Sequence, residues 1–502
     1  ILLSGQQLTN NGTIQSADAL TLALTQNFTS GKNSKLTASG TAALQALALT
    51  NQGQWIAKNL SISGNTLNNE GEISGVDGLT LTLQNALTQQ SSGKLQSNGS
   101  TEITASHLDN AGQLQTRALT LNTARLDNSG ILQARESMDL TLTGDAQNHA
   151  GGVILSDGTL NLHAATFNND GIAQGTTRAT FDLSQGISNQ GRLLSGGQLN
   201  LDASDFLNTG WLQSDSLNLN IANTLTNRGT VIAQNQATLG GNALENSGTV
   251  QAGALTLDQA GVNTAGTLFA AQMLNLTTQT LGNASNAKIF SAGDITLNSR
   301  SLAQDGQIVA LGNVTLTLLE ALTQSGTVAA GKALNVGTSG DFIQNGTMQG
   351  QSLLLTSGAN FSNQGTLTGG DGIFSIRAGN IRQNASGSLQ SGGDVSLESR
   401  ADIANSGFIG TAGNLLLSAT GTLTNSALLY SALDMTLLAD RISNIQGDIL
   451  AGNNLWMMKD AAGNASSETV NSSGTIETTH GDISIYTGHL LNERNGLSFS
   501  HE

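Results

Sequence analysis

The sequence repeats one short pattern at an interval of about twenty residues, and this period limits the possible fold more than any other feature. Asn208-Thr209-Gly210 and Asn227-Arg228-Gly229 are two copies of an Asn-x-Gly triplet, with the alternating stretch SLNLNI between them. An aliphatic residue stands two positions after most of these glycines. Alternation with a period of two indicates strands, not helices. Triplets of this kind have their glycines at Gly12, Gly53, Gly71, Gly112, Gly130, Gly171, Gly191, Gly210, Gly229, Gly248, Gly365 and Gly407.

A strand and a turn in twenty residues cannot bury a core alone, but stacked copies can. The sequence therefore predicts an all-β fold, a right-handed parallel β-helix (solenoid) of about 24 coils of about 20 residues. We expect the corner asparagine to be left-handed and the glycine to use a positive φ. Stacked asparagines of this kind can hydrogen-bond along the solenoid. We expect such a corner ladder at Asn110, Asn128, Asn169, Asn189, Asn208, Asn227 and Asn246.

The composition agrees with this fold and excludes several functions. The 502 residues include 61 glycines but no proline and no cysteine, and 11% are charged. Proline cannot donate to a sheet, so its absence suits a backbone that is paired almost everywhere. Without cysteine there is neither a disulfide framework nor thiol catalysis. The net charge of −16 argues against nucleic-acid binding, and no apolar run is long enough to be a transmembrane segment.

The repeat changes along the chain. Asn-x-Gly is nearly unbroken from Asn110 to Gly248, whereas Gln304, Gln324 and Gln344 occupy later corners. After Gly447 the interval widens. We therefore divide the chain into a regular part, residues 1–262, and a variant part, residues 263–502, that has a distinct role. Gradual divergence of the repeat within one uninterrupted solenoid would explain the same changes in sequence.

Little in the sequence indicates catalysis, and we expect no catalytic residue, metal site or cofactor. The six histidines lack HExxH or paired metal spacing, and neither GxSxG nor a phosphate-binding glycine loop occurs. A carbohydrate-cleaving β-helix is the enzymatic alternative, and it needs carboxylates gathered on neighbouring coils. Charged residues are sparse and we find none that recurs at a common offset, so the sequence favours a non-enzymatic protein.

The segment LWMMK stands out in the least regular coil. It contains Trp456, Met457, Met458 and Lys459. Tryptophan and methionine are favoured at contact surfaces, which makes these four residues candidates for contact with a receptor. A strand whose alternate residues are buried in the core would have the same sequence pattern.

The repeat unit L-x-N-x-G-x-[ILV], as in LDNSGILQARESMDLTL from Leu126 to Leu142, resembles the filamentous-haemagglutinin repeat of two-partner-secretion exoproteins. This resemblance covers almost the whole chain. The segment GDISIYTGHLLNERNGLSF, from Gly481 to Phe499, is similar to the segment that follows such repeats in contact-dependent growth inhibition effectors. The second resemblance is shorter.

The resemblance implies a secreted protein of the bacterial cell surface. Effectors of this kind pass through an outer-membrane partner transporter and form a β-helical stick. A region beyond the first repeat block binds an outer-membrane protein or lipopolysaccharide of a neighbouring Gram-negative bacterium, before a toxin is delivered. By this resemblance, residues 1–262 would be the stick and residues 263–502 the candidate receptor-binding region. The alternative is a haemagglutinin-type adhesin that binds host cells or glycans. Because neither a secretion domain nor a toxin-like end is evident, we expect an internal segment of a longer protein.

Overall fold

The computed structural model describes residues 1–496, and every regular element in them is a β-strand. Two compact units are present, Ile1–Gly253 and Ala254–Glu502. Together they contain about 25 turns of about 20 residues, and the pairing between turns is parallel, which confirms the predicted all-β solenoid. The right hand of the coil stays a prediction. Residues 497–499, at the end of the segment that begins at Gly481, lie outside the described part.

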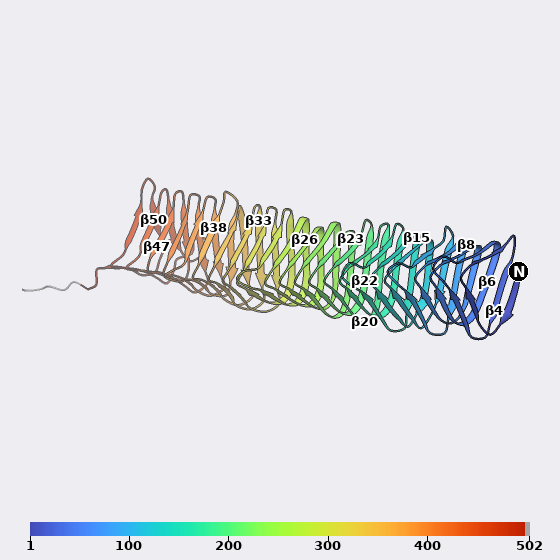
Figure 1. The fold of residues 1–502 in the computed structure, drawn as a ribbon. Helices are drawn as coiled ribbons and strands as arrows, with labels where there is room; N and C mark the ends of the chain where they lie inside the picture. Colours follow the sequence, from blue (N-terminus) through green and yellow to red (C-terminus); the bar gives the residue numbers. More distant parts are fainter. Residues whose placement is uncertain (497–502) are drawn as a thin grey trace, which may run out of the picture. The chain divides into compact units, whose positions relative to one another are not determined.

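In the first unit, long strands run through corners of the turns, and each strand stacks on its counterpart in the next turn (Figure 1). Leu201 is in register with Phe181 on one side and with Leu219 on the other. One-residue shifts in the register occur where these strands bend, for example between Ala203 and Asp205. The strands of this stretch are β20 (Arg178–Asn189), β21 (Arg192–Ser195), β22 (Gln198–Asn208), β23 (Trp211–Asn227) and β24 (Thr230–Asn246).

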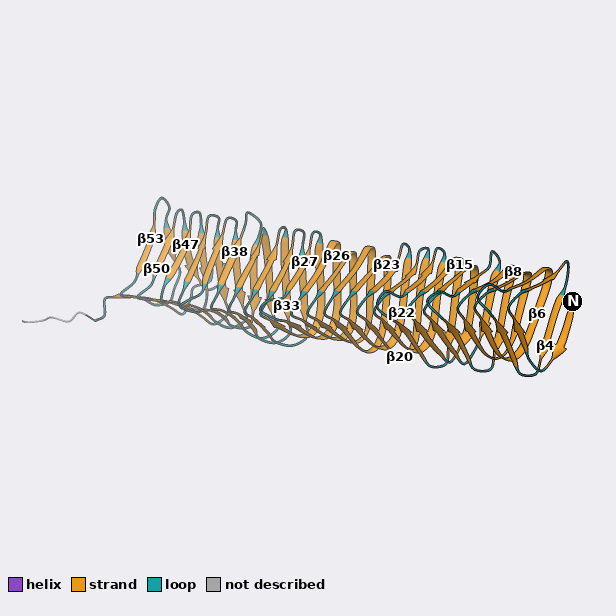
Figure 2. Cartoon of the chain, viewed as in Figure 1, coloured by secondary structure: helices purple, strands orange, loops and turns teal. Residues whose placement is uncertain are grey.

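In the second unit most turns consist of three short strands joined by brief loops (Figure 2). Each strand pairs with the strand three places before it and three places after it, so that the strands form three parallel sheets. Phe342, Phe361 and Ile381 stand in register in one sheet. Two successive turns are β34 (Phe342–Gln344), β35 (Thr347–Gly350) and β36 (Ser352–Ser357), then β37 (Phe361–Asn363), β38 (Thr366–Gly369) and β39 (Phe374–Ala378).

The core of each unit is a set of inward columns of aliphatic side chains. Alternate strand residues point inward, and residues such as Leu201, Leu219 and Leu239 are buried one above the other. Aromatic rings are few but they stack: the Phe28 and Trp55 rings lie 4.9 Å apart. The Trp55 indole N–H donates to Ser30 Oγ at 2.8 Å, so the ring is buried without an orphaned donor.

The corner glycines correct one expectation from the sequence. Among the described residues, positive φ occurs only at Gly151, Gly241, Gly463, Gly496, Gln446 and Ser473. None of them is the asparagine or the glycine of an Asn-x-Gly corner, so neither residue of the corner has the expected left-handed conformation. The requirement for glycine at these corners comes from the backbone of the neighbouring turn. A Cβ at Gly210 would collide with the carbonyl oxygen of Gly191, and one at Gly229 with that of Gly210. Glycine is needed because successive corners stack backbone against backbone.

Candidate functional site

The buried corner holds a ladder of side-chain amides. Asn208 Nδ2 donates to Asn227 Oδ1 at 2.9 Å, and also lies within hydrogen-bond distance of the carbonyl oxygens of Gly210 and Thr230. Each rung is therefore satisfied by the next rung and by the backbone, as a buried amide requires. The continuous run contains Asn110, Asn128, Asn148, Asn169, Asn189, Asn208, Asn227 and Asn246. Sequence reasoning missed Asn148 because the segment NHAGG lacks the Asn-x-Gly triplet.

Glutamine interrupts the ladder at most of its corners, although Gln324 Nε2 still donates to Gln344 Oε1 at 2.9 Å. Gln89 accepts a hydrogen bond from Asn69 but donates onward to the carbonyl oxygen of Gln113. Gln304 and Gln383 behave in the same way, each accepting from an asparagine and donating to backbone. These glutamine amides bond to a backbone carbonyl of the next turn, as the asparagine amides also do, but not to the next side chain. In the second unit a run of five asparagines is present at Asn405, Asn425, Asn444, Asn471 and Asn492.

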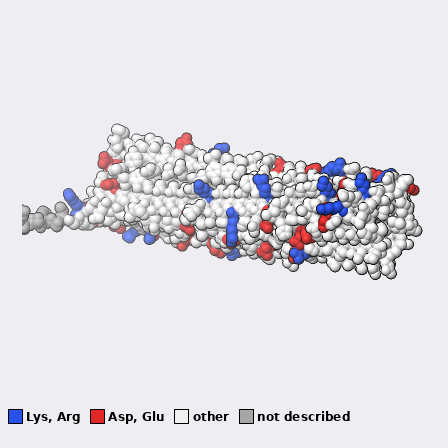
Figure 3. Space-filling view, in the orientation of Figure 1, with Lys and Arg blue, Asp and Glu red and all other residues white. Residues whose placement is uncertain are grey.

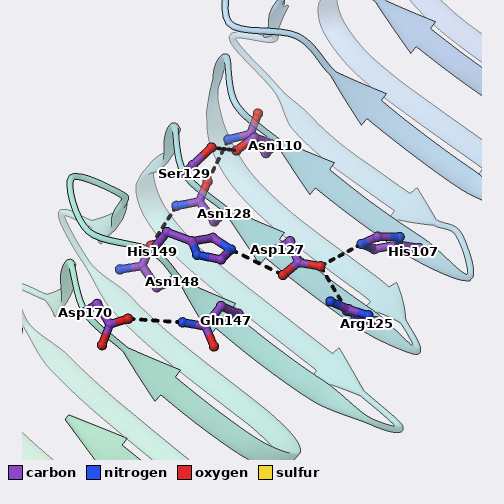
Figure 4. Close-up of polar contacts among 10 residues, drawn as sticks. All are labelled: His107, Asn110, Arg125, Asp127, Asn128, Ser129, Gln147, Asn148, His149 and Asp170. Carbon is purple, nitrogen blue, oxygen red and sulfur yellow. Dashed lines mark hydrogen bonds and ion pairs between the residues drawn. The ribbon is translucent and has the colours of Figure 1, made fainter. Parts of the chain in front are cut away.

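The most connected charged group of the first unit is the carboxylate of Asp127, on β14 (Arg125–Asn128). Figure 4 shows it between two histidines and an arginine. Its Oδ2 lies 2.9 Å from His107 Nε2 and 2.9 Å from Arg125 Nε, and its Oδ1 lies 3.3 Å from His149 Nε2. His107 comes from the preceding turn and His149 from the turn after it, so one carboxylate links three turns.

The electrostatics of Asp127 do not suit acid catalysis. The side chain is only 15% exposed, and this burial acts to raise the pKa of Asp127. Hydrogen bonds from His107, Arg125 and His149, with the charge of Arg125, outweigh burial and leave the pKa of Asp127 below its ordinary value. The group is ionised at neutral pH, so it has no proton to donate. In residues 1–496 no group of three or more His, Asp or Glu side chains, this one included, has an arrangement that could hold a metal ion.

Charged residues do stand in register between some neighbouring turns, which corrects the expectation that none recurs at a common offset. Arg377 is in register with Glu398 and lies 3.4 Å from it, and Arg441 stands in the same relation to Glu468 at 3.3 Å. These side chains are largely exposed, so each pair contributes little stability alone. On the face seen in Figure 3, basic and acidic side chains are scattered among uncharged ones.

The four residues predicted to contact a receptor lie at or just after β51 (Leu455–Met458), but they do not share a face. Met457 is 0% exposed and belongs to the core. Trp456 and Met458 are half-buried on the outer side, and Lys459 is exposed, with its Nζ 3.8 Å from Asp440 Oδ1. Only Trp456, Met458 and Lys459 are therefore available to a partner in the folded chain.

A shallow groove of about 380 Å³ opens beside Trp456. Its floor and walls include Ile373, Leu416, Asn414, Asp394 and Asp434, so it combines apolar surface with carboxylates. A loop follows β51 where the repeat widens, and there Asp460 Oδ1 accepts the backbone N–H groups of Ala462 and Asn464. Sequence reasoning found Trp456 but missed the groove, because its walls come from four other turns.

Nothing in residues 1–496 forms a helix with the length and apolar character needed to cross a membrane. No solved structure matches the chain. A family model described as the haemagglutinin repeat matches residues 56–140, 366–427 and 410–455.

Curated relatives match over nearly the whole chain. The tRNA nuclease CdiA of Escherichia coli (strain NC101) is 44% identical over 500 residues, 99% of this chain and 15% of the relative. The deoxyribonuclease CdiA of Dickeya dadantii (strain 3937) is 39% identical over 479 residues, 95% of this chain and 14% of the relative. The 16S rRNA endonuclease CdiA of Enterobacter cloacae subsp. cloacae is 43% identical over 502 residues, 100% of this chain and 15% of the relative.

The chain thus spans about 15% of the length of the curated relatives it matches. The repeat match falls in both units, and the corner ladder gives those repeats a structural basis. With relatives that are similar from end to end, these observations identify the chain as a filamentous-haemagglutinin-repeat protein of the contact-dependent inhibition type, and specifically as a stick region of it.

Proposed function

We propose that this chain is the non-enzymatic part of a contact-dependent growth inhibition protein that extends from the producing bacterium and binds an outer-membrane receptor on a neighbouring one. In this proposal the whole protein is exported through an outer-membrane partner transporter and acts at the cell surface. Delivery of a toxin would follow binding and would depend on segments of the longer protein. The first unit is the spacer, and the receptor-contacting surface lies in the variant turns after residue 262.

One observation carries the proposal. The chain is 39–44% identical, along almost its whole length, to relatives named for three different activities: a tRNA nuclease, a deoxyribonuclease and a 16S rRNA endonuclease. A segment that stays alike while the named activity changes serves a step that those proteins have in common. Reaching a target cell is such a step, whatever the toxin attacks.

The architecture supports the same role. In a solenoid each turn contacts only its neighbours, so added turns add length without a new core. The asparagine ladder and stacked glycine corners are structural features and leave no open side chain for chemistry. The Asp127 cluster ties turns together and holds its carboxylate ionised. These features favour a spacer and a binding surface over an enzyme.

Binding of the purified full chain to whole bacteria tests the proposal. The chain would be fluorescently labelled and incubated with Gram-negative cells, with cells carrying single outer-membrane protein deletions, and with cells whose lipopolysaccharide is truncated. We expect saturable binding that one deletion abolishes. A heat-unfolded sample of the same labelled chain controls for unspecific adhesion.

Two results would contradict the proposal. Binding that is equal on all envelope mutants would mean that no single receptor is recognised. Saturable binding to eukaryotic cells or immobilised host glycans, with none to bacteria, would support the haemagglutinin-type adhesin instead.

A further inference from the structure

The groove beside Trp456 is built from side chains of five successive turns. Ser396, Leu416, Thr436 and Trp456 stand in register on the outer side of one parallel sheet. Ile373, 70% exposed, lies at one end of the groove. The half-buried indole and the aliphatic side chains give the groove an apolar surface that nothing in residues 1–496 covers.

One wall of the groove is a column of acidic and amide side chains that are held in place by the backbone. Asp394 Oδ1 accepts the N–H of Asn414 at 2.9 Å, and Asn414 Oδ1 accepts the N–H of Asp434 at 3.0 Å. Asp434 Oδ1 in turn accepts the N–H of Asn454 at 3.0 Å. The Oδ2 atoms of Asp394 and Asp434 have no protein partner in the described part of the chain. The wall therefore presents two ordered carboxylates with free acceptors.

The charge of this groove is unbalanced. Two carboxylates line it, and neither lysine nor arginine is among its lining residues. The nearest basic residue along β51, Lys459, is paired with Asp440 beyond the far end of the strand. A cation above the indole face would be attracted both by the ring and by the carboxylates, while its aliphatic stem would cover Leu416.

We propose that the groove beside Trp456 binds an arginine or lysine side chain presented by a partner protein. Arginine fits best, because its planar guanidinium stacks on an aromatic ring and donates to carboxylates at the same time. The inference deepens the proposed function and rests on it, because the proposed function places the partner protein on a neighbouring bacterium. It favours a protein receptor with a basic loop. Phosphate-rich lipopolysaccharide would be repelled by two carboxylates that have no neighbouring cation.

The test uses the full chain labelled with 5-fluorotryptophan. The sequence has three tryptophans, so fluorine NMR gives three signals, and Trp456→Phe and Trp211→Phe variants assign them. Trp55 is fully buried and serves as an internal reference. The probes are an acetyl-Gly-Arg-Gly-amide peptide, the same peptide with uncharged citrulline, N-acetylglucosamine, and lipopolysaccharide core oligosaccharide.

We expect the arginine peptide to shift the Trp456 signal with a dissociation constant on the order of millimolar, as for one exposed charged contact. The citrulline peptide and both saccharides should bind at least about threefold more weakly. The double variant Asp394→Asn, Asp434→Asn should weaken arginine binding roughly threefold to tenfold. Asn414 accepts a backbone N–H in the same column, so these substitutions keep the wall intact.

Asp402→Asn is the matched control. Asp402 Oδ1 accepts the N–H of Thr422 at 2.8 Å in a second column of this kind, and it does not line the groove. Combined with Asp341→Asn in the same second column, it removes an equal charge and should leave the Trp456 titration unchanged. Equal shifts from arginine and citrulline, or tighter binding of either saccharide, would overturn the proposal.

A cell-binding experiment separates this inference from the proposed function. If Trp456→Ala and the double aspartate variant lose both the peptide and the cells, the groove is part of the receptor surface. If they lose the peptide but bind cells normally, the link to the receptor is wrong while the proposed function stands. If the unaltered chain binds the peptide but no bacteria, the proposed function fails and the chemistry of the groove remains.

Discussion

Asn208 Nδ2 lies 2.9 Å from Asn227 Oδ1, one turn further along the chain, and both side chains are 0% exposed. The same bond joins Asn189 to Asn208 at 2.8 Å. A buried amide of this kind has a large desolvation cost unless all its donors are used. The ladder meets that condition and thereby makes each turn depend on its neighbours.

Replacing Asn208 with alanine should therefore destabilise the surrounding turns by about 1–3 kcal/mol, since Asn189 loses an acceptor and the carbonyl oxygen of Thr230 loses a donor. Hydrogen–deuterium exchange is the suitable measurement, because a repeat array does not unfold as one two-state unit. Asn218→Ala, at an exposed position of the next strand, β23, should change protection by less than about 0.5 kcal/mol. Equal loss of protection in both variants would contradict the ladder's role.

The stacked corners predict a second difference. Gly210→Ala should lower stability by about 1–3 kcal/mol, because the new methyl group would meet the Gly191 carbonyl. Gly12→Ala should be nearly neutral, since nothing lies within 4 Å of a Cβ there. Ala427 occupies one corner naturally, and the bond from the Leu428 N–H to the Gly407 oxygen there is 3.3 Å, against 2.9 Å from Trp211 to Gly191. Thermal unfolding followed by circular dichroism would compare the two variants, and a tolerated Gly210→Ala would show that the corners have room.

Gln259 is a weak point of the second unit. Its side chain is 2% exposed and neither amide atom has a hydrogen-bond partner. Gln259→Leu should raise the stability of the second unit by about 1 kcal/mol, because it removes a buried amide that makes no hydrogen bond. The same change at Gln304 should destabilise the unit, since that amide accepts from Asn283 and donates to two carbonyls. Hydrogen–deuterium exchange of both variants measures the contrast, and a loss of protection in Gln259→Leu would contradict the account.

The Asp127 cluster predicts a dependence on pH. Since the pKa of Asp127 is lowered in the folded chain, its contribution to stability is present above the unfolded pKa and is lost as the pH falls through the folded pKa. Asp127→Asn should therefore destabilise the first unit at pH 6 by about 1 kcal/mol, and the difference should shrink toward pH 2.

The measurement is the melting temperature of both proteins across that pH range. Asp182→Asn serves as a control, because Asp182 is largely exposed and contacts a single histidine, His163. It should have a smaller effect. A difference at Asp127 that does not depend on pH would mean that the substitution acts through packing and not through charge.

The period of the sequence was enough to predict the solenoid and the positions of seven ladder asparagines, because each turn must return to the same corner. It did not reveal why glycine is needed there. Reasoning from a single turn suggested a positive φ, whereas the requirement comes from the carbonyl of the turn before. The role of a corner glycine is visible only when two turns are placed together.

The same limit applies to the side-chain clusters. His107 and His149 are 42 positions apart in the sequence, and only the stacking brings both to Asp127. Asn148 and Gly152 are four positions apart where Asn128 and Gly130 are two apart, so a fixed period would not have aligned the two histidines. The groove beside Trp456 draws on turns that begin more than eighty residues earlier. In the LWMMK segment, by contrast, the alternation of inward and outward residues along a strand is enough to predict that Met457 lies on the opposite face from Trp456 and Met458.

The amide ladder also has a direction. Every asparagine in a run donates toward the C-terminal side and accepts from the N-terminal side, so the amide dipoles point the same way and reinforce one another. A turn that folds onto a completed predecessor meets an oriented donor, and one that folds onto a completed successor meets an oriented acceptor. The two ends of a growing stack therefore offer different groups to the incoming turn. A run ends where a glutamine donates only to backbone, as Gln89, Gln304 and Gln383 do.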